Sequence, residues 1–424
     1  MKLNYRKIGE HIQLVDERNK GLKIKQLLGL SISKQFIPSV ANIIGTDMEN
    51  YKIIRKNQFA CSTMQVRRDK KMPVALLQEA DEAIISQAYP IFEVKDESEL
   101  LPEYLMMWFT RSEFDREACF HSVGGVRGSL EWEDFCEMQL PIPTITKQRA
   151  IVKEYNVIQN RIALNQQLIQ KLEETAQAIY KQWFVEFEFP FDFAQSKPDE
   201  YGKPYKSSGG EMVWNEELGK EVPEGWRMGT LNELVDIIDG DRGTNYPSIE
   251  EMFNNGYCLF LNAGNVTKIG FDFSETKFIT KEKDEKLRKG KLKRNDIVLT
   301  SRGTVGNVAF YSEVILFDHI RINSGMVIMR AKDFSESTIV IYSMLRNSEM
   351  KIAIDNYLSG SAQPQLPIKD LIKIPILIPE NDRIIEFSKL TIKIQILIDR
   401  TDIQNQKLTE LKDLLLSKLA TIEN

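Results

Sequence analysis

The stretch "LPIPTITKQRAIV" (residues 140–152) joins a proline-punctuated apolar strand to the start of a long helical pattern. Proline cannot take part in a central strand ladder and is disfavoured inside a helix. The prolines therefore predict that a strand ends here and that a helix begins just after it. The same transition recurs in "IPILIPENDRII" (residues 374–385). The chain thus contains two strand-to-helix joints about half its length apart.

An internal repeat accounts for the two joints. "MWFTRSEF" (107–114) corresponds to "SMLRNSEM" (343–350), and "QKLEE" (170–174) corresponds to "QKLTE" (406–410), each pair 236 positions apart. Such self-similarity indicates that one architecture is built twice. We predict an α+β fold with two repeated domains of mixed helices and strands. Two long antiparallel coiled-coil helices separate the domains, and the whole has pseudo-twofold symmetry.

The predicted boundaries follow from the repeat. They are a first globular domain (1–145), a first spacer helix (146–186), a linker (187–226), a second globular domain (227–379) and a second spacer helix (380–424). The linker is rich in Gly, Pro and Ser, and we expect its alternating phenylalanines to serve packing.

Both spacer helices carry heptad patterns, in which apolar residues recur every seven positions. A helix of about 40 residues is about 60 Å long. Leu390, Leu397 and Leu411 are expected to fill a second seam, while Val152, Val157, Ile392 and Ile398 stay outside it. Asn165 and Thr401 would form a polar layer that fixes the register, although an ordinary amphipathic helix that tolerates one polar residue explains them equally well. The predicted seam residues are Ile151, Ile158, Asn165, Leu172, Ile179, Phe387, Ile394, Thr401, Leu408 and Leu415.

Composition limits the class of protein. Hydrophobic residues make up 42% and charged residues 28%, as in soluble globular proteins, and the net charge is −5. Four scattered cysteines and three histidines make disulfides and a zinc site improbable, and no apolar run is long enough for a membrane span. We expect a cytoplasmic protein without a signal peptide. The net negative charge leaves room only for local basic patches.

Catalytic signatures are not found. The sequence has no GxxxxGK[ST] phosphate loop, no GxGxxG after a strand and no Asn-Pro-Pro-aromatic motif. Glu275 and Lys277 form a nuclease-like acidic-x-Lys triplet, which chance explains in so charged a chain. We therefore predict no catalytic residue, no metal site and no cofactor bound by this chain.

Several polar and basic loops are better suited to DNA. They are "STMQVRRDKK" (62–71), "GGVRGS" (124–129), "KLRKGKLKR" (286–294), "TSRGTVGN" (300–307) and "SGSAQPQ" (359–365). Arginine and glutamine can grip base edges bidentately, lysine mostly holds phosphate, and glycine lets backbone amides approach closely. The alternative for any one loop is a glycine-rich turn with solvated charges. The candidate DNA-binding residues are Ser62, Gln65, Arg67, Arg68, Lys70, Lys71, Arg127, Lys289, Lys291, Lys293, Ser301, Arg302, Thr304, Asn307, Ser361, Gln363 and Gln365.

With these motifs, the chain resembles the specificity subunits of type I restriction–modification systems over nearly its whole length. The resemblance rests on residues 140–190, on "GKPYKSSGGEMVWNEELGKEVPEGW" (202–226), and on the loops at 295–307 and 359–379. It implies that each domain reads half of a split double-stranded DNA target. It also implies docking of two methyltransferase subunits and, through them, of restriction subunits, with S-adenosylmethionine, ATP and Mg on those partners. The first domain departs from the pattern, because "CSTMQVRRDKK" stands where the second has "TSRGTVGN".

Two other classes remain open at this point. One is an enzyme that carries a fused nuclease or methyltransferase activity. The other is a coiled-coil scaffold that binds only proteins, and salt-dependent, sequence-selective DNA binding separates it from a specificity subunit.

Overall fold

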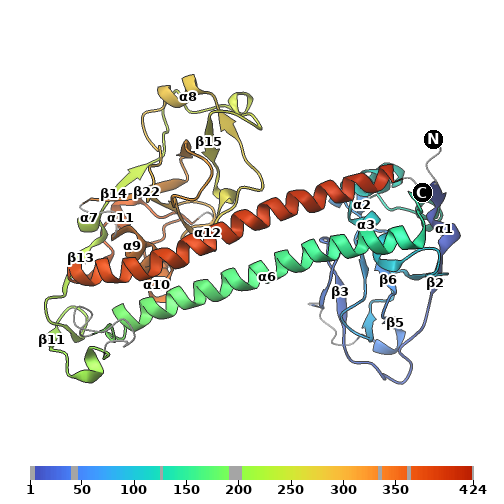
Figure 1. Ribbon diagram of the computed structural model, residues 1–424, viewed down its shortest axis with the longest axis horizontal. Coiled ribbons are helices and arrows are strands. Elements are labelled where there is room, and N and C mark those ends of the chain that lie inside the picture. The colour runs from blue at the N-terminus through green and yellow to red at the C-terminus, as the bar shows by residue number, and fades with distance from the viewer. Residues whose placement is uncertain are drawn as a thin grey trace. The chain divides into compact units, whose positions relative to one another are not determined.

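The computed structural model describes residues 5–39, 46–124, 128–190, 203–332, 337–360 and 364–422 (Figure 1). The chain divides into two compact units: unit 1 contains residues 1–163 and 407–424, and unit 2 contains residues 164–406. Helices α6 (Ile145–Phe184) and α12 (Asn381–Lys418) each contribute to both units. Within the described ranges, no helix is both long enough and apolar enough to cross a membrane.

Unit 1 is organised around a four-stranded antiparallel sheet of order β2-β9-β6-β7. Three further strand pairs are β1-β10, β3-β4 and β5-β8. Its strands are β1 (Tyr5–Lys7), β2 (Ile12–Val15), β3 (Leu28–Leu30), β4 (Phe36–Pro38), β5 (Lys52–Arg55), β6 (Phe59–Cys61), β7 (Val74–Leu76), β8 (Glu82–Ile85), β9 (Ile91–Val94) and β10 (Gln139–Pro141). Its helices are α1 (Ile8–His11), η1 (Met48–Asn50), α2 (Val66–Asp69), α3 (Pro102–Thr110), α4 (Ser112–His121), α5 (Trp132–Glu137) and η5 (Leu419–Thr421).

Unit 2 contains a second four-stranded sheet of order β14-β22-β19-β20, with β15 between β18 and β21 in a smaller sheet. Its strands are β11 (Met212–Asn215), β12 (Lys220–Pro223), β13 (Arg227–Thr230), β14 (Val235–Asp239), β15 (Cys258–Leu261), β16 (Val266–Thr267), β17 (Gly270–Phe271), β18 (Phe278–Ile279), β19 (Ile297–Thr300), β20 (Val308–Phe310), β21 (Ile320–Ile322), β22 (Met326–Ala331) and β23 (Pro375–Ile378). Its helices are η2 (Lys206–Ser208), α7 (Leu231–Leu234), η3 (Ile249–Glu251), η4 (Ala263–Asn265), α8 (Lys281–Lys286), α9 (Ser337–Arg346), α10 (Ser348–Asn356) and α11 (Ile368–Leu371).

The two units repeat the same topology. β1 pairs antiparallel with β10 in unit 1, and β13, which follows the β11-β12 hairpin, pairs antiparallel with β23 in unit 2; the central sheet has the same order of strands in both units. Two helices with a break between them follow the sheet in both units, as α3 and α4 and as α9 and α10. The predicted α+β class and the internal repeat are confirmed.

The central sheet of unit 2 explains why its strands read as unbroken apolar runs. Alternate residues of β19 face opposite sides: Ile297 and Leu299 belong to the core that includes α9, whereas Val298 belongs to the core that includes β15 and β21. Because both faces are covered, neither set of side chains meets water.

The joint between β10 and α6 is held by one buried glutamine. The Gln148 side chain is fully buried; its Nε2 donates to Glu99 O at 2.7 Å and to Pro143 O at 2.8 Å. Its Oε1 accepts from the Leu101 backbone amide at 2.9 Å. The side chain therefore ties the first turn of α6 to the strand end and to the start of α3.

Within each unit, α6 and α12 run antiparallel (Figure 1). In unit 2, Phe387 packs between Tyr180 and Phe184, with ring centroids 6.1 and 4.9 Å away. Farther along, Asn165 Nδ2 donates to Gln404 Oε1 at 3.0 Å and to Asn405 Oδ1 at 2.9 Å. Asn165 therefore does not pair with Thr401, whose hydroxyl donates to Leu397 O of its own helix.

The second seam predicted for α12 is wrong. Leu390, Leu397 and Leu411 are 46%, 45% and 47% exposed, whereas Ile398, expected outside the seam, is 3% exposed. Val152 is likewise buried, although Val157 is exposed as expected and Ile392 is half-buried. The reason is that α12 packs against the second domain as well as α6, so its buried stripe is wider than a two-helix seam and turned to one side.

The ten predicted seam residues fall into two groups. Ile158, Asn165, Phe387 and Thr401 are buried. The other six are half-buried: Ile151, Leu172, Ile179, Ile394, Leu408 and Leu415.

The expected linker is more ordered than its composition suggested. Strands β11 and β12 form a hairpin within it. Phe187 and Phe189 are each 2% exposed, and the Phe189 ring stacks on Tyr205 and Trp226 with centroids 4.5 and 5.5 Å away. These aromatic rings serve packing, whereas Phe191 and Phe193 lie outside the described residues.

Gln148→Ala should lower the free energy of unfolding by about 3 kcal/mol, because it leaves buried backbone groups without partners. Gln166→Ala, an exposed position on the same helix, should change it by less than about 0.5 kcal/mol. Urea denaturation followed by circular dichroism measures both. Equal effects of the two substitutions would show that Gln148 has no special role at the joint.

Candidate nucleic-acid interface

Two of the predicted loops meet in unit 2. The loop after β19 places Arg302 beside Gln365 in an isolated β-bridge, and the Leu366 amide donates to Ser301 O at 2.9 Å. The Ser301 and Arg302 amides both donate to Gly325 O, at 2.8 and 3.1 Å. Segments 301–307, 359–360 with 364–366, and 323–325 therefore form one continuous surface. Ser361 and Gln363 lie outside the described residues.

The side chains of the loop after β19 divide into two kinds. Arg302 and Thr304 are exposed. Ser301 is buried, and Asn307 Nδ2 donates to Val266 O at 3.0 Å. Ser301 and Asn307 therefore shape the loop, and Arg302 and Thr304 are the candidate residues that it exposes to solvent. Gly303 and Gly306 have φ of 75° and 88°, a conformation that favours glycine.

Unit 1 brings its two candidate loops together in the same way. The Leu130 amide donates to Thr63 O at 2.9 Å, and the short helix α2 covers the loop that follows α4. The Arg67 guanidinium donates to Ser122 O at 2.6 Å and to Gly124 O at 3.1 Å. The Arg67 side chain thus holds this loop in place. It is therefore not the free cation that the sequence predicted. Arg127 lies outside the described residues.

The other candidates of unit 1 surround α2. Arg68 pairs with its neighbour Asp69 at 2.6 Å, and this hydrogen bond lowers the pKa of Asp69. Lys70 and Lys71 are exposed, whereas Ser62 and Gln65 are half-buried. A helix thus replaces the glycine loop of unit 2 at this place, which is the departure from the family pattern that the sequence showed.

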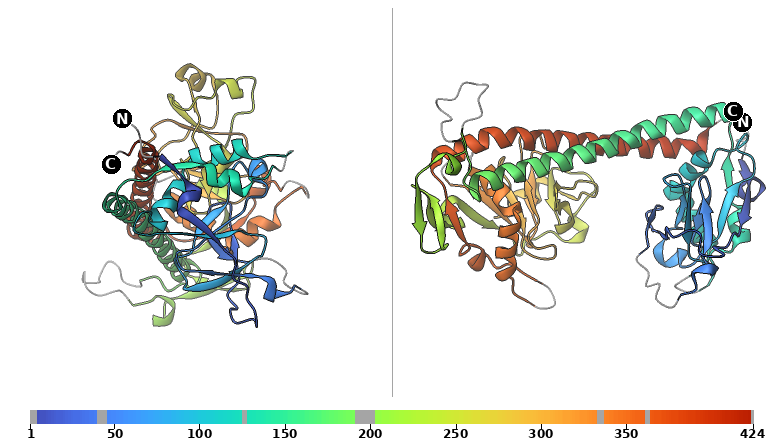
Figure 2. Two further views of the ribbon diagram at one scale, coloured as in Figure 1. Left: turned by 90° about the vertical axis from the view of Figure 1, so that its right-hand side faces the viewer. Right: turned by 90° about the horizontal axis from the view of Figure 1, so that it is seen from below.

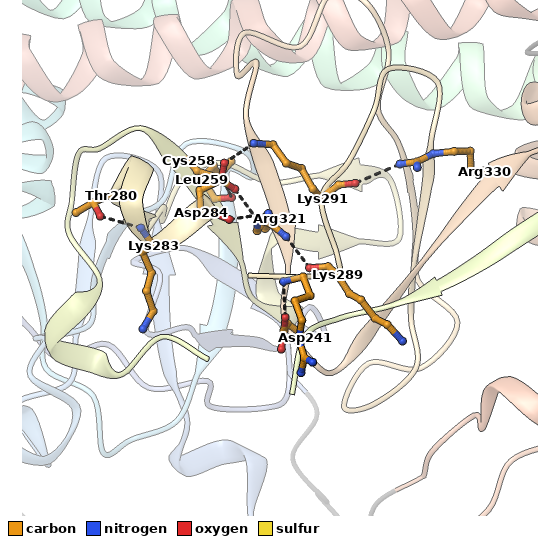
Figure 3. A network of polar contacts seen from close by, with 11 residues as sticks. Asp241, Cys258, Leu259, Thr280, Lys283, Asp284, Lys289, Lys291, Arg321 and Arg330 are labelled. Carbon is orange, nitrogen blue, oxygen red and sulfur yellow. Dashed lines mark hydrogen bonds and ion pairs between the residues drawn. The ribbon is translucent and has the colours of Figure 1, made fainter. Parts of the chain in front are cut away.

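The basic run at 286–294 is not a uniform row of free lysines. Lys291 forms an ion pair with Asp284, which is 2% exposed and also accepts from Arg321 Nε at 2.5 Å (Figure 3). Burial by itself would raise the pKa of Asp284, but the hydrogen bonds from Lys291 and Arg321 hold that pKa below its ordinary value. Lys291 is therefore not a free cation, because a buried carboxylate requires a partner, and its contact with phosphate stays a prediction. Lys289 and Lys293 are exposed.

The nuclease-like triplet is not assembled as a site. Lys277 Nζ donates to Asn254 Oδ1 at 2.7 Å, and the Glu275 carbonyl accepts from Asn265 Nδ2 at 2.7 Å. In the part of the chain that the structure describes, no group of three His, Cys, Asp or Glu residues could hold a metal ion.

Two exposed arginines beside these loops escaped the sequence reasoning. Arg242 follows β14 in "GDRGTN" (240–245), and Arg288 lies in the basic run. The sequence did contain a signal for Arg242, because "GDRGTN" places an arginine next to a glycine after a strand, as "TSRGTVGN" does.

A family model described as the type I restriction modification DNA specificity domain matches residues 40–174 and 223–413, well over half of the chain. This chain belongs to the type I restriction–modification DNA specificity family. The resemblance noted from the sequence is confirmed, and the matched segments include most of both units.

Individual relatives agree with the family. The specificity subunit of the type I restriction enzyme MjaIX from Methanocaldococcus jannaschii is 26% identical over 329 residues, which are 76% of this chain and 68% of the relative. The specificity subunit of the type I restriction enzyme HindI from Haemophilus influenzae is 23% identical over 432 residues, covering 90% of this chain and 89% of the relative. The crystal structure of a type I S subunit from M. genitalium covers 100% of this chain and 99% of that chain at 16% identity, with a TM-score of 0.56, and shares the fold.

Arg302→Ala should weaken binding to the preferred duplex by about 1–3 kcal/mol, mainly by lost discrimination, because arginine in a glycine-bearing loop can reach base edges. Lys293→Ala should weaken preferred and scrambled duplexes alike, since a lysine on the surface holds phosphate. Titration against both duplexes at several salt concentrations measures the difference. A uniform loss in the Arg302 variant would make this arginine a phosphate contact.

Proposed function

We propose that this chain reads a split DNA target, with unit 1 and unit 2 each recognising one half-site. The observation that carries the proposal is the repeated meeting of two polar loops in corresponding places of the two units. Leu130 and Leu366, 236 positions apart, donate their amides to Thr63 O and Ser301 O respectively. A fold that builds the same polar surface twice is suited to a target with two separated parts.

We further propose that α6 and α12 dock two methyltransferase subunits. The supporting observation is a set of large apolar side chains that these helices leave exposed by 43–62%. They are Val157, Leu164, Leu168, Leu390, Leu397, Leu411 and Leu414. Exposed apolar residues on long helices are typical of surfaces that receive a partner.

Catalysis in this proposal belongs to the partners. The methyltransferase subunits would bind S-adenosylmethionine, and restriction subunits that join through them would use ATP and Mg. This chain would supply sequence recognition and assembly without being an enzyme itself, and acting on cellular DNA would place its work in the cytoplasm. A fused nuclease is not favoured, because Glu275 and Lys277 make separate structural contacts. A fused methyltransferase is not favoured, because the sequence lacks the Asn-Pro-Pro-aromatic motif.

Exchange of residues 1–140 for those of a relative with a different target should change one half-site and leave the other intact. The exchange ends at the last residues before the β10–α6 joint, so that the host retains both long helices. Mapping of methylated adenines in a genome that carries the hybrid and its partners measures the outcome. If both half-sites changed together, the two units would not read independently.

Insertion of four residues after Gln166 tests the helices. Because α6 is continuous through this point, the insertion adds about 6 Å and rotates the distal part by about 40°. The methylated target should then show a different gap between unchanged half-sites, or methylation should be lost. A replacement of four residues in the same place by alanine-rich sequence, without a change in length, is the control and should retain the gap.

A further inference from the structure

The inference concerns the loops that flank Arg302 in unit 2, and it starts from a buried carboxylate. Asp241 is 6% exposed; its Oδ1 accepts from the Gly243 amide at 2.7 Å and its Oδ2 from the Arg288 amide at 2.8 Å (Figure 3). The hydrogen bond from Gly243 above all, and then the one from Arg288, hold the pKa of Asp241 below its ordinary value. The Asp241 carboxylate thus connects the loop after β14 to the segment at 287–290 through hydrogen bonds.

Glycines let the same loops touch through their backbones. A Cβ atom on Gly240 would lie 2.1 Å from Asn323 O, and one on Gly290 would lie 3.3 Å from the Gly240 Cα. Gly290 also has a φ of 82°. Three loops are therefore packed directly on one another, and side chains can only project outward from them.

Cationic side chains project from this support. Arg242 Nη2 donates to Ser324 O at 3.3 Å, and a Cβ on Gly243 would lie 3.0 Å from Arg288 Nη2. The Arg302 amide donates to Gly325 O, so the loop after β19 lies next to this group and adds the Arg302 side chain to it. We call Arg242, Arg288, Lys289 and Arg302 the basic edge. All four are exposed, and within the described ranges only Arg242 has an acid within ion-pair distance, Asp239 at 3.1 Å.

The corresponding edge of unit 1 has the same backbone arrangement but different electrostatics. The loop after β2 runs beside β5, with the Ile53 amide donating to Glu17 O at 2.8 Å. Arg18 pairs with Asp16 at 3.0 Å, and Arg55 pairs with Glu17 at 2.8 Å and with Glu82 at 2.7 Å. Arg18 and Arg55 are thus paired with neighbouring carboxylates, whereas Arg288, Lys289 and Arg302 form no ion pair with any described residue. The loop after β2 also carries three exposed lysines, Lys20, Lys23 and Lys25.

We propose that Arg242, Arg288 and Lys289 bind DNA phosphates, and that Arg18 and Arg55 at the matching edge of unit 1 do not. The ligand is the sugar–phosphate backbone of duplex DNA that flanks the bases facing Arg302. Phosphate contacts release counterions and set the salt dependence of binding, so these three cations contribute to it. Asp241 is a positioning residue, because it holds two of these side chains in place through their backbones. The proposal rests on the proposed function, since it assumes that the loops face DNA.

The test compares matched edges of the same protein. The slope of log Kobs against log salt is measured by fluorescence anisotropy for the full-length chain with preferred and scrambled duplexes. Arg242→Ala combined with Arg288→Ala should reduce the slope by about 2, with both duplexes affected alike, because each phosphate contact contributes about 0.9. Arg18→Ala, in the corresponding loop of unit 1, should leave the slope unchanged.

Two controls separate charge from folding. Arg242→Lys combined with Arg288→Lys keeps both charges and should retain most of the slope, whereas a loss as large as that of the alanine pair would make the arginines structural and overturn the proposal. Arg227→Ala removes an exposed cation of β13 that pairs with Glu233 of α7; β13 pairs with β23 and is not part of the loops that form the basic edge. Its slope should equal that of the wild type.

Each remaining outcome has a definite meaning. An unchanged slope in the alanine pair, or an equal drop for Arg18→Ala, overturns this inference while the proposed function stands. A loss confined to the preferred duplex makes the arginines base readers and also overturns it. RNA that competes better than duplex DNA of equal length would assign the edge to another nucleic acid. A wild-type protein without salt-dependent DNA binding would instead contradict the proposed function.

Discussion

The hydrophobic core of unit 1 includes residues from the C-terminal end of α12 and from η5. Leu416 and Leu419 are buried in the core of unit 1, and the Tyr5 hydroxyl donates to Ala420 O at 3.0 Å. Strand β10, which pairs with β1, contacts η5, so the first and last described segments of the chain lie near one another in unit 1 (Figure 2). Contacts between residues this distant in sequence form late, so unit 1 cannot bury its whole core until α12 has been made and has paired with α6. Unit 1 therefore depends on the pairing of α6 with α12 for the completion of its core.

Unit 2 attaches its recognition part to the same helices through buried polar groups. Glu173 of α6 pairs with Arg346 of α9 at 2.7 Å, and both side chains are nearly inaccessible to water. Burial raises the pKa of Glu173, and the nearby Arg346 offsets part of this rise. Gln177 adds a hydrogen bond to Ser343 O at 3.1 Å. Such buried pairs contribute little net stability but penalise displacement strongly, because a shift would leave a charge without its partner. The domain is therefore held in a fixed orientation on its helix segment.

The architecture could be predicted from the sequence, whereas the burial of individual residues could be predicted only in part. Repeated residues such as Ser112 and Ser348 revealed two copies of one fold, and prolines marked where the helices begin. Heptad counting could not locate the buried stripe of α12, because a helix that faces both a helix and a domain buries more than two positions per heptad. It buries Thr391 and Gln395 and exposes Leu397. Apolar character alone did not distinguish these positions.

The candidate site shows the same limit in its charges. A run of lysines and arginines looks uniform in sequence, yet the Lys291 side chain forms an ion pair with a buried acid, whereas the Arg288 side chain forms none with any described residue. Similarly, Arg67 is used to hold a loop that lies more than fifty residues away in sequence. Which cations remain available depends on tertiary neighbours that periodicity and composition do not encode. What sequence could supply was the association of arginine with glycine after a strand, which located Arg302 and would also have located Arg242.

The way in which the loops of unit 2 are supported bears on how such a protein can acquire a new target. Gly240, Gly290 and Gly325 make the contacts that hold the loops, and Asp241 adds backbone hydrogen bonds. The exposed positions between them contribute almost nothing to this support. Substitutions at those positions can therefore accumulate without loss of folding, while changes at the glycines cannot. The surface separates residues open to variation from residues that must stay, and that separation makes the recognition face adaptable while the protein remains stable.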